Sequence, residues 1–336
     1  MPRSTGARNK SEVSEERATA RRRALFALAA SGVIVSLFVL RGFEEARPGG
    51  SQTSLVAKPS EALSEALFGK VRPDAPPFEA SLVDTIRRRG ALTVTLHVAL
   101  FADTGNGRAG AFGDGDNPAT NLYWGALYGV ETHFANAAGW QRRYTDDGGG
   151  PPLLRRVVFS RRVEPTPAWR ERGVDKPFDL FVLANAWPNA RIIEAMEQPL
   201  RDAICGAPVR IEIDGRMLEF AGGSAVVGYV GQNHMLDEYW DPFAQLGGCA
   251  PSRQVGVFYL CPRSAVVLHE PVVRRGLYAV LFTRSAATPE AYLVDGMFRG
   301  LASGELGDAF IAGAAAEYAR YQKTVSVARA ASMLIR

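Results

Sequence analysis

The chain has 336 residues, of which 47% are hydrophobic, and a formal net charge of +4. This composition excludes a low-complexity chain and is sufficient for one large α/β domain or two small ones. The basic excess lies entirely in residues 1–23, and the neutral remainder gives no electrostatic indication of nucleic-acid binding.

The N-terminal region predicts a membrane anchor. Residues 1–23 form a basic tail, and residues 24–40 contain no charged side chain. Seventeen such residues approach the ~20 that span a bilayer. The basic residues before them predict a signal anchor with the tail in the cytoplasm and the main domain on the extracytoplasmic side of the cytoplasmic membrane. A cleaved signal peptide and a soluble protein are the alternatives. Residues 41–77, rich in Pro, Gly and Ser, are expected to be a linker.

Residues 78–336 predict a single α/β domain. Apolar strands alternate with amphipathic helices, which is typical of a mainly parallel sheet covered on both faces. Strands are expected at 91–101, 153–163, 178–184, 225–231, 255–260 and 277–283, with a hairpin at 209–220 around Asp214-Gly215. Helices are expected at 81–89, 119–138 and 189–204, from Thr288-Pro289-Glu290 onward, and over most of 307–333.

Two apolar runs end abruptly at residue types that carry chemistry. The run from Ala225 stops at Gln232, Asn233 and His234, and the run from Val255 stops at Cys261. The carboxyl ends of parallel strands meet at one edge of an open α/β sheet, where active sites lie. A cysteine and a histidine brought together there are suited to thiolate chemistry.

Cys261 is the candidate nucleophile. Its proximity to Arg263 suggests a lowered thiol pKa, although a cysteine buried as a small hydrophobic side chain is the alternative. The three cysteines leave at least one thiol unpaired in an exported domain, and a Cys205–Cys249 disulfide would leave Cys261 free. His234 is the nearest candidate base, and a surface-loop histidine is its alternative interpretation.

Other motifs are weak. Gly105–Gly110 matches G-x-G-x-x-G, but the next helix begins too late to receive a pyrophosphate at its N-terminus. Asp114–Asn117 lacks the spacing of a calcium loop, and no His/Cys cluster has zinc spacing. The sequence therefore predicts no cofactor and no metal.

The succession of these segments resembles the caspase-like (clan CD type) fold of cysteine peptidases, with bacterial relatives, over about residues 90–330. Four segments resemble an uncharacterised bacterial group that we associate with this fold: Asn121–Val130, Gly228–Asp237, Pro289–Tyr292 and Tyr318–Lys323. The resemblance implies a three-layer domain in which one strand ends at a catalytic histidine and the next at a catalytic cysteine. Here Gln232 stands where the histidine is expected. The segment Cys261-Pro-Arg-Ser264 has one residue more than the Cys-Lys-Ser that the resemblance implies.

The resemblance implies roles for individual residues. Cys261 would attack a peptide carbonyl, His234 would replace the missing base, and backbone N–H groups near Gly231 would hold the oxyanion. In the loop after the first strand, Arg108 would favour an acidic substrate side chain, while Asp103 would favour a basic one. The sequence thus predicts a membrane-anchored cysteine endopeptidase or, alternatively, an inactive relative that binds a peptide or protein partner.

Overall fold

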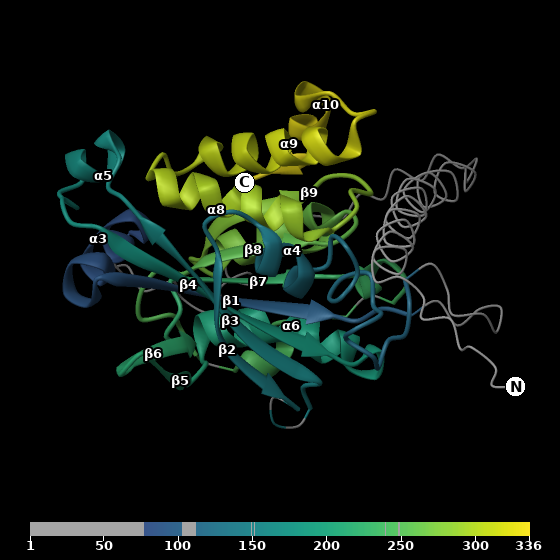
Figure 1. The fold of residues 1–336 in the computed structure, drawn as a ribbon. Coiled ribbons are helices and arrows are strands. Elements are labelled where there is room, and N and C mark those ends of the chain that lie inside the picture. Colours follow the sequence, from purple (N-terminus) through teal and green to yellow (C-terminus); the bar gives the residue numbers. More distant parts are fainter. Residues whose placement is uncertain (1–76, 103–111, 149, 151, 239, 248) are drawn as a thin grey trace, which may run out of the picture. The chain divides into compact units, whose positions relative to one another are not determined.

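The computed structural model describes residues 77–336, except 103–111, 149, 151, 239 and 248 (Figure 1). The basic tail 1–23, the predicted membrane helix 24–40 and the predicted linker up to residue 76 lie outside the described residues. Among the residues that are described, no helix is long and apolar enough to cross a membrane. The first described helix begins at Phe78.

An eight-stranded sheet forms the centre of the domain, with the strand order β10-β9-β8-β7-β1-β4-β3-β2 (Figure 1). Strands β9, β8, β7, β1 and β4 are parallel, whereas β10, β3 and β2 join through antiparallel pairs. The predicted α/β class with a mainly parallel sheet is therefore confirmed. The strands are β1 (Ala91–Ala99), β2 (Gln141–Asp147), β3 (Arg155–Val163), β4 (Phe178–Trp187), β7 (Val226–Val230), β8 (Gly256–Leu260), β9 (Tyr278–Thr283) and β10 (Leu334–Ile335).

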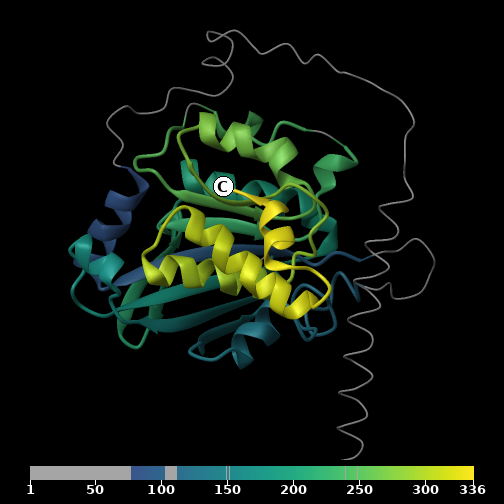
Figure 2. The same cartoon turned by 90° about the horizontal axis from the view of Figure 1, so that it is seen from above.

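Helices cover both faces of this sheet (Figure 2). Buried side chains of α4, α8 and α9 form one apolar cluster with the sheet, and those of α6 and α7 belong to a second. Strand β1 is buried along its whole length, as expected for a central parallel strand. The helices are α3 (Phe78–Arg89), α4 (Val130–Asn136), α5 (Pro167–Glu171), α6 (Ile192–Ile204), α7 (Glu270–Arg274), α8 (Ala291–Ser303), α9 (Asp308–Gln322) and α10 (Val327–Ser332).

The predicted hairpin is confirmed as a separate two-stranded sheet of β5 (Pro208–Ile213) and β6 (Arg216–Ala221). Its turn residues Asp214 and Gly215 have φ values of 51° and 75°. A two-residue turn with both φ values positive matches the twist of the flanking strands, and Asp-Gly is a preferred sequence for it.

The helix predicted over 119–138 is wrong in its first half. Only Val130–Asn136 is helical, and the residues before it form successive turns. The chain packs too tightly there for a regular helix of ordinary residues: a Cβ on Gly125 would lie 2.3 Å from the Pro118 carbonyl oxygen, and one on Gly129 would lie 2.4 Å from the Trp124 backbone. These turns bury Tyr123 and Trp124 but leave Leu127 44% exposed, so the apolar periodicity does not mark one buried helical face.

Strand β2 was not predicted from the sequence. Its residues, QRRYTDD, are mostly exposed, because β2 is the edge strand and pairs only with β3. Charged residues and a register irregularity between Arg142 and Tyr144 are typical of edge strands, in which they discourage pairing with other chains. An edge strand of this kind carries no apolar alternation.

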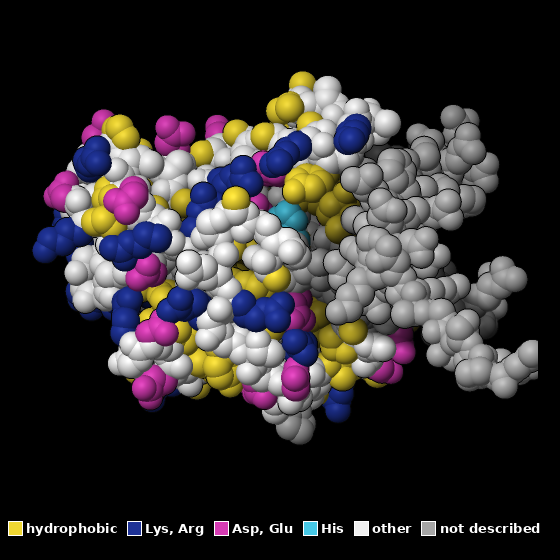
Figure 3. Space-filling view, in the orientation of Figure 1, with side chains coloured by type: hydrophobic (Ala, Val, Ile, Leu, Met, Phe, Trp, Pro, Cys, Tyr) yellow, Lys and Arg dark blue, Asp and Glu magenta, His cyan; other side chains and the backbone are white. Residues whose placement is uncertain are grey.

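Charged side chains of both signs are intermixed on the face shown in Figure 3. Several carboxylates each pair with two arginines: Glu131 pairs with Arg142 and Arg155, and Asp179 pairs with Arg162 and Arg216. The arginines of β2 and β3 are thus largely neutralised, in agreement with the balanced charge of the sequence beyond the tail.

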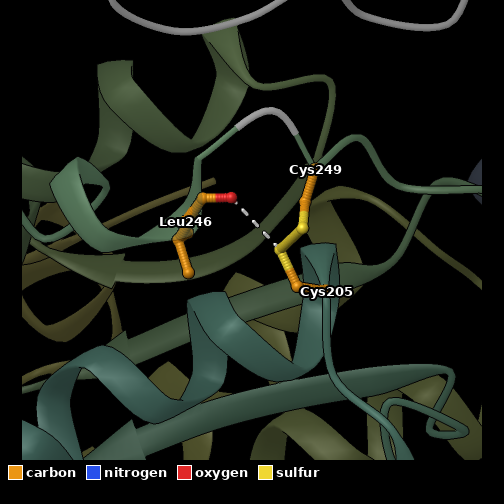
Figure 4. Close-up of a disulfide and its surroundings, with 3 residues drawn as sticks. All are labelled: Cys205, Leu246 and Cys249. Carbon is orange, nitrogen blue, oxygen red and sulfur yellow. Dashed lines mark hydrogen bonds between the residues drawn. A yellow bond between two sulfur atoms is a disulfide. The ribbon is translucent and has the colours of Figure 1, made fainter.

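A disulfide joins Cys205 to Cys249, with 5.6 Å between their Cα atoms (Figure 4). Cys205 is the C-cap residue of α6, and Cys249 lies in the connection between β7 and β8. Cys261 is left as a free, buried thiol. This is the pairing that the sequence allowed but did not determine.

Candidate functional site

The predicted meeting of two strand ends is confirmed. Strands β7 and β8 are adjacent and parallel, with Val230 opposite Leu260. The Gly231 N–H donates to the Leu260 carbonyl oxygen over 3.3 Å, which extends the pairing just beyond the strands. Gln232 and Cys261 therefore emerge from neighbouring strands at the carboxyl edge of the sheet.

Gln232 is held by two tyrosines. Its side-chain Nε2 donates to the Tyr123 hydroxyl over 2.8 Å, and its backbone carbonyl accepts a hydrogen bond from the Tyr229 hydroxyl over 2.9 Å. A Cβ on the preceding Gly231 would lie 2.5 Å from the Tyr229 hydroxyl oxygen, so only glycine fits there. The amide is therefore fixed in one orientation and directed at Tyr123.

Tyr123 is positioned by the turns that precede α4. The Asn121 side chain donates to the carbonyl oxygens of Phe101 and Asp114 and accepts from the Tyr123 N–H. Burial raises the pKa of Tyr123 well above its usual value, and the nearby acidic groups of Glu290 and Cys261 add to the rise, although the hydrogen bond with Gln232 opposes it. The hydroxyl therefore stays neutral at physiological pH.

Cys261 is completely buried within an apolar cluster. Burial raises the pKa of its thiol, and a hydrogen bond with Ser264 offsets only part of that effect. The lowered pKa expected from Arg263 is therefore not found: the Arg263 side chain is exposed to solvent, where it does not offset the loss of hydration. Cys261 is a neutral thiol at physiological pH and is inaccessible to a substrate.

His234 lies apart from this thiol. It begins a short 3₁₀-helix (His234–Leu236) capped by the Asn233 side chain, which accepts from the Met235 N–H. The His234 side chain is 37% exposed, and its Nδ1 lies 3.7 Å from an Asp237 carboxylate oxygen. Within the described residues, no hydrogen bond or ion pair joins His234 to Cys261. The turn after Gly231 directs the histidine toward solvent.

Two predicted substrate-binding residues cannot be placed. Asp103 and Arg108 lie outside the described residues, as does the Gly105–Gly110 loop. Among the residues that are described, no group of three or more His, Cys, Asp or Glu side chains is arranged to hold a metal ion.

A buried carboxyl group near this edge was missed by the sequence analysis. Glu290 is the N-cap residue of α8 and is only 5% exposed. The Tyr292 hydroxyl donates to its Oε2 over 2.5 Å. Burial raises the pKa of Glu290 to about 7, although this hydrogen bond acts in the opposite direction. The sequence presented Glu290 as an ordinary residue of a helix start, where a carboxylate is usually exposed.

Large apolar side chains are exposed beyond three of the parallel strands. Ile193, Leu236 and Val266 are 39%, 40% and 72% exposed, and each lies six residues beyond the end of its strand (β4, β7 and β8). We call these three residues the apolar rim. Because the three strands are parallel, the segments that carry these residues leave the sheet at the same edge as Gln232 and Cys261.

No protein-family model, curated protein or solved structure matches the chain. The chemistry of the site is therefore interpreted from its geometry. Among the described residues, that geometry provides an accessible apolar rim and a fixed amide, and Cys261 is neither accessible nor hydrogen-bonded to a base.

Proposed function

We propose that this chain is a membrane-anchored, caspase-like protein that does not cleave peptides and instead binds a peptide or protein partner at the carboxyl edge of its sheet. The observation that carries the proposal is the burial of Cys261 together with the presence of a glutamine where the histidine is expected. Cys261 is fully buried, and Gln232, at the position expected for the histidine, is held by Tyr123.

The caspase-like part of the proposal is supported by the order of the elements. Strand β7 ends at the position expected for the histidine, the adjacent strand β8 ends at Cys261, and β9 and α8 follow. Helices lie on both faces of the mainly parallel sheet. This succession is the one that the sequence resemblance implies.

The absence of peptidase activity follows from acid–base chemistry. A cysteine nucleophile reacts as the thiolate, which requires a lowered pKa or an adjacent base. Burial instead raises the pKa of Cys261. An amide such as that of Gln232 has no basic nitrogen, and the contacts of His234 are with Asp237 and Trp240. None of the three predicted catalytic positions therefore supplies a thiolate.

The binding role is supported by the apolar rim. Partner-binding surfaces place exposed apolar side chains around a small number of polar groups. Ile193, Leu236 and Val266 are the exposed apolar groups, and the fixed amide of Gln232 is a polar group at the same edge. An extended peptide could pack its apolar side chains against the rim and form a hydrogen bond with the Gln232 amide.

Membrane anchoring completes the proposal. Residues 24–40 would span the cytoplasmic membrane and place the domain on its extracytoplasmic side. Extraction of cell membranes at alkaline pH should leave the full-length chain in the membrane pellet, while a chain lacking residues 1–40 should not be found there.

The binding role is tested with an immobilised peptide library. The full-length chain in detergent micelles is expected to retain a subset of peptides, and Leu236→Asp or Val266→Asp should weaken that binding at least tenfold. Met217→Asp is the matched control, because Met217 on β6 is also an exposed apolar residue, at 59%. It lies away from the proposed site: its neighbour Arg216 donates to the carbonyl oxygen of Arg89, which precedes the first residue of β1, at the amino end of that strand. Equal loss in all three variants, or no retention by the native chain, would contradict the proposal.

A further inference from the structure

The Cys205–Cys249 disulfide lies at the surface and joins a helix that packs firmly on the sheet to a connection with little regular structure. Both half-cystines are exposed. Cys205 ends α6, a helix held to the sheet by buried side chains such as Met196 and Leu200. Cys249 lies in the connection between β7 and β8, where the described residues form only two short 3₁₀-helices. The disulfide therefore ties a loosely structured connection to a well-packed helix (Figure 4).

Three buried side chains of the same connection pack in the cluster that contains Cys261. They are Met235, Phe243 and Leu246, which are 4%, 2% and 4% exposed and which we call the covering residues. The Asn233 side chain also donates to the carbonyl oxygen of Pro262, the residue after Cys261, over 2.7 Å. The connection that carries Cys249 thus contributes side chains to the same buried cluster as the Cys261 thiol and is hydrogen-bonded to the residue that follows it.

Leu246 links the disulfide to this cover directly. The Sγ of Cys205 lies 3.4 Å from the Leu246 carbonyl oxygen, and Leu246 is three residues before Cys249 (Figure 4). Gly247 and Cys249 are exposed, and the next buried side chain among the described residues is that of Pro251. The disulfide is the covalent link between this end of the connection and α6, and the hydrogen bond from Arg201 to Gln245 over 3.5 Å is a weaker, non-covalent one.

We infer that Cys205 and Cys249 form a reversible thiol–disulfide site whose reduction by a dithiol releases the covering residues and makes the Cys261 thiol accessible. The thiolate of the dithiol attacks one sulfur of the disulfide, which breaks the S–S bond and leaves a mixed disulfide. The second thiol of the reductant then displaces the protein sulfur. Two electrons and two protons pass to the protein, giving two cysteine thiols and the oxidised, cyclic reductant.

The connection, rather than α6, is expected to move after reduction, because α6 packs more extensively on the sheet. Helix α6 remains in place after reduction because its apolar face is buried independently of Cys205. Reduction removes the disulfide that links the connection to α6 and leaves non-covalent contacts, namely the burial of the covering residues and the hydrogen bond from Asn233 to Pro262. Exposed disulfides of this kind are the ones that reductants reach. The inference concerns the reactivity of Cys261 and holds whether or not a partner binds at the apolar rim.

The test is native-state alkylation of the full-length chain by iodoacetamide, with the modification of the Cys261 peptide quantified by mass spectrometry. In the oxidised chain, Cys261 should be nearly unreactive. Prior treatment with dithiothreitol should accelerate its alkylation at least tenfold. A Cys205→Ser/Cys249→Ser variant should show the fast rate with and without the reductant, which separates loss of the disulfide from other effects of the reagent.

A second variant and a second measurement exclude trivial explanations. Phe243→Ala removes a covering side chain without touching the disulfide, and it should accelerate Cys261 alkylation in the oxidised chain. Hydrogen exchange of β1 should remain slow after reduction. The inference is overturned if Cys261 stays unreactive in the reduced chain, if it is equally reactive in the oxidised chain, or if β1 loses protection together with Cys261.

Discussion

Gln232 and Cys261 occupy adjacent strand ends, yet their surroundings differ. Gln232 is fixed by polar contacts with Tyr123 and Tyr229, whereas Cys261 is surrounded by apolar side chains. The Gln232 side-chain amide donates a hydrogen bond to Tyr123, and the Cys261 thiol is protonated because burial penalises its charged form. Both environments stabilise the fold at the expense of thiolate chemistry.

Asp295 in α8 and Glu290 at its N-cap show how strongly neighbouring groups determine the pKa of a buried carboxyl group. Burial alone would raise the pKa of Asp295, but hydrogen bonds from His133 and Trp140 and the charge of Arg299 lower it to about 2. No ion pair with a cation is found for Glu290 in the described part of the chain, and burial raises its pKa to about 7. Asp295 is thus a permanently charged structural group, while Glu290 gains or loses its proton near physiological pH.

The stability of the domain should therefore depend on Glu290 between pH 4.5 and 8. Glu290 keeps its proton up to about pH 7 in the folded state, whereas the unfolded chain releases it near pH 4.5. The contribution of the protonated Glu290 to the free energy of unfolding is therefore fully present below pH 4.5 and is lost as pH rises through 7. The loss is on the order of 3 kcal/mol at ~1.4 kcal/mol per pKa unit. Urea denaturation should show that Glu290→Gln flattens this dependence.

Glu305→Gln is the control for this experiment because Glu305 is exposed. It should leave the pH dependence of the native chain unchanged. A Glu290→Gln variant with the same slope between pH 4.5 and 8 as the native chain would show that Glu290 is ionised throughout that range in the folded state.

At the scale of elements, the packing of α8 against α9 depends on facing glycines. A Cβ on Gly313 would lie 2.2 Å from the Gly296 carbonyl oxygen, and one on Gly296 would lie 2.4 Å from the Gly313 carbonyl oxygen. The two backbones therefore approach as closely as they do only because neither position has a side chain. This contact holds α9 against the helix that carries Asp295 and follows Glu290.

Gly313→Ala should destabilise the protein by about 1–3 kcal/mol, although alanine favours a helix over glycine by about 1 kcal/mol. The clash with the Gly296 carbonyl outweighs the gain in propensity. Ala312→Gly, at an exposed neighbouring position, should lose only about 1 kcal/mol. Thermal or urea unfolding measures both, and a Gly313→Ala chain more stable than the native chain would refute the close contact.

At the scale of the whole molecule, the buried strands and the Asp-Gly hairpin could be predicted, but the exposed edge strand and the turns before α4 could not. The apolar runs that became β1, β4, β7, β8 and β9 carry their own signal, and so does the Asp214-Gly215 turn. Strand β2 lacks apolar alternation because it lies at the edge. The residues before α4 have a helical pattern, but their glycines pack against backbone in turns.

The candidate site could be predicted in position but not in chemical state. Strand order placed Gln232 and Cys261 together, as the sequence implied. The burial of Cys261 depends on side chains such as Phe243, and the burial of Glu290 depends on the surrounding tyrosines and α8. Such enclosure arises from residues distant in sequence, so no local pattern reveals it.

The central proposal is that the site at Gln232 and Cys261 does not hydrolyse peptides, and cleavage of a peptide library by the full-length chain tests it most directly. The native chain should release no fragments above those produced by Cys261→Ala, under reducing and oxidising conditions and with or without calcium. Cleavage by the native chain that disappears in Cys261→Ala would contradict the claim and establish a cysteine peptidase, and His234→Ala would then test the substitute base.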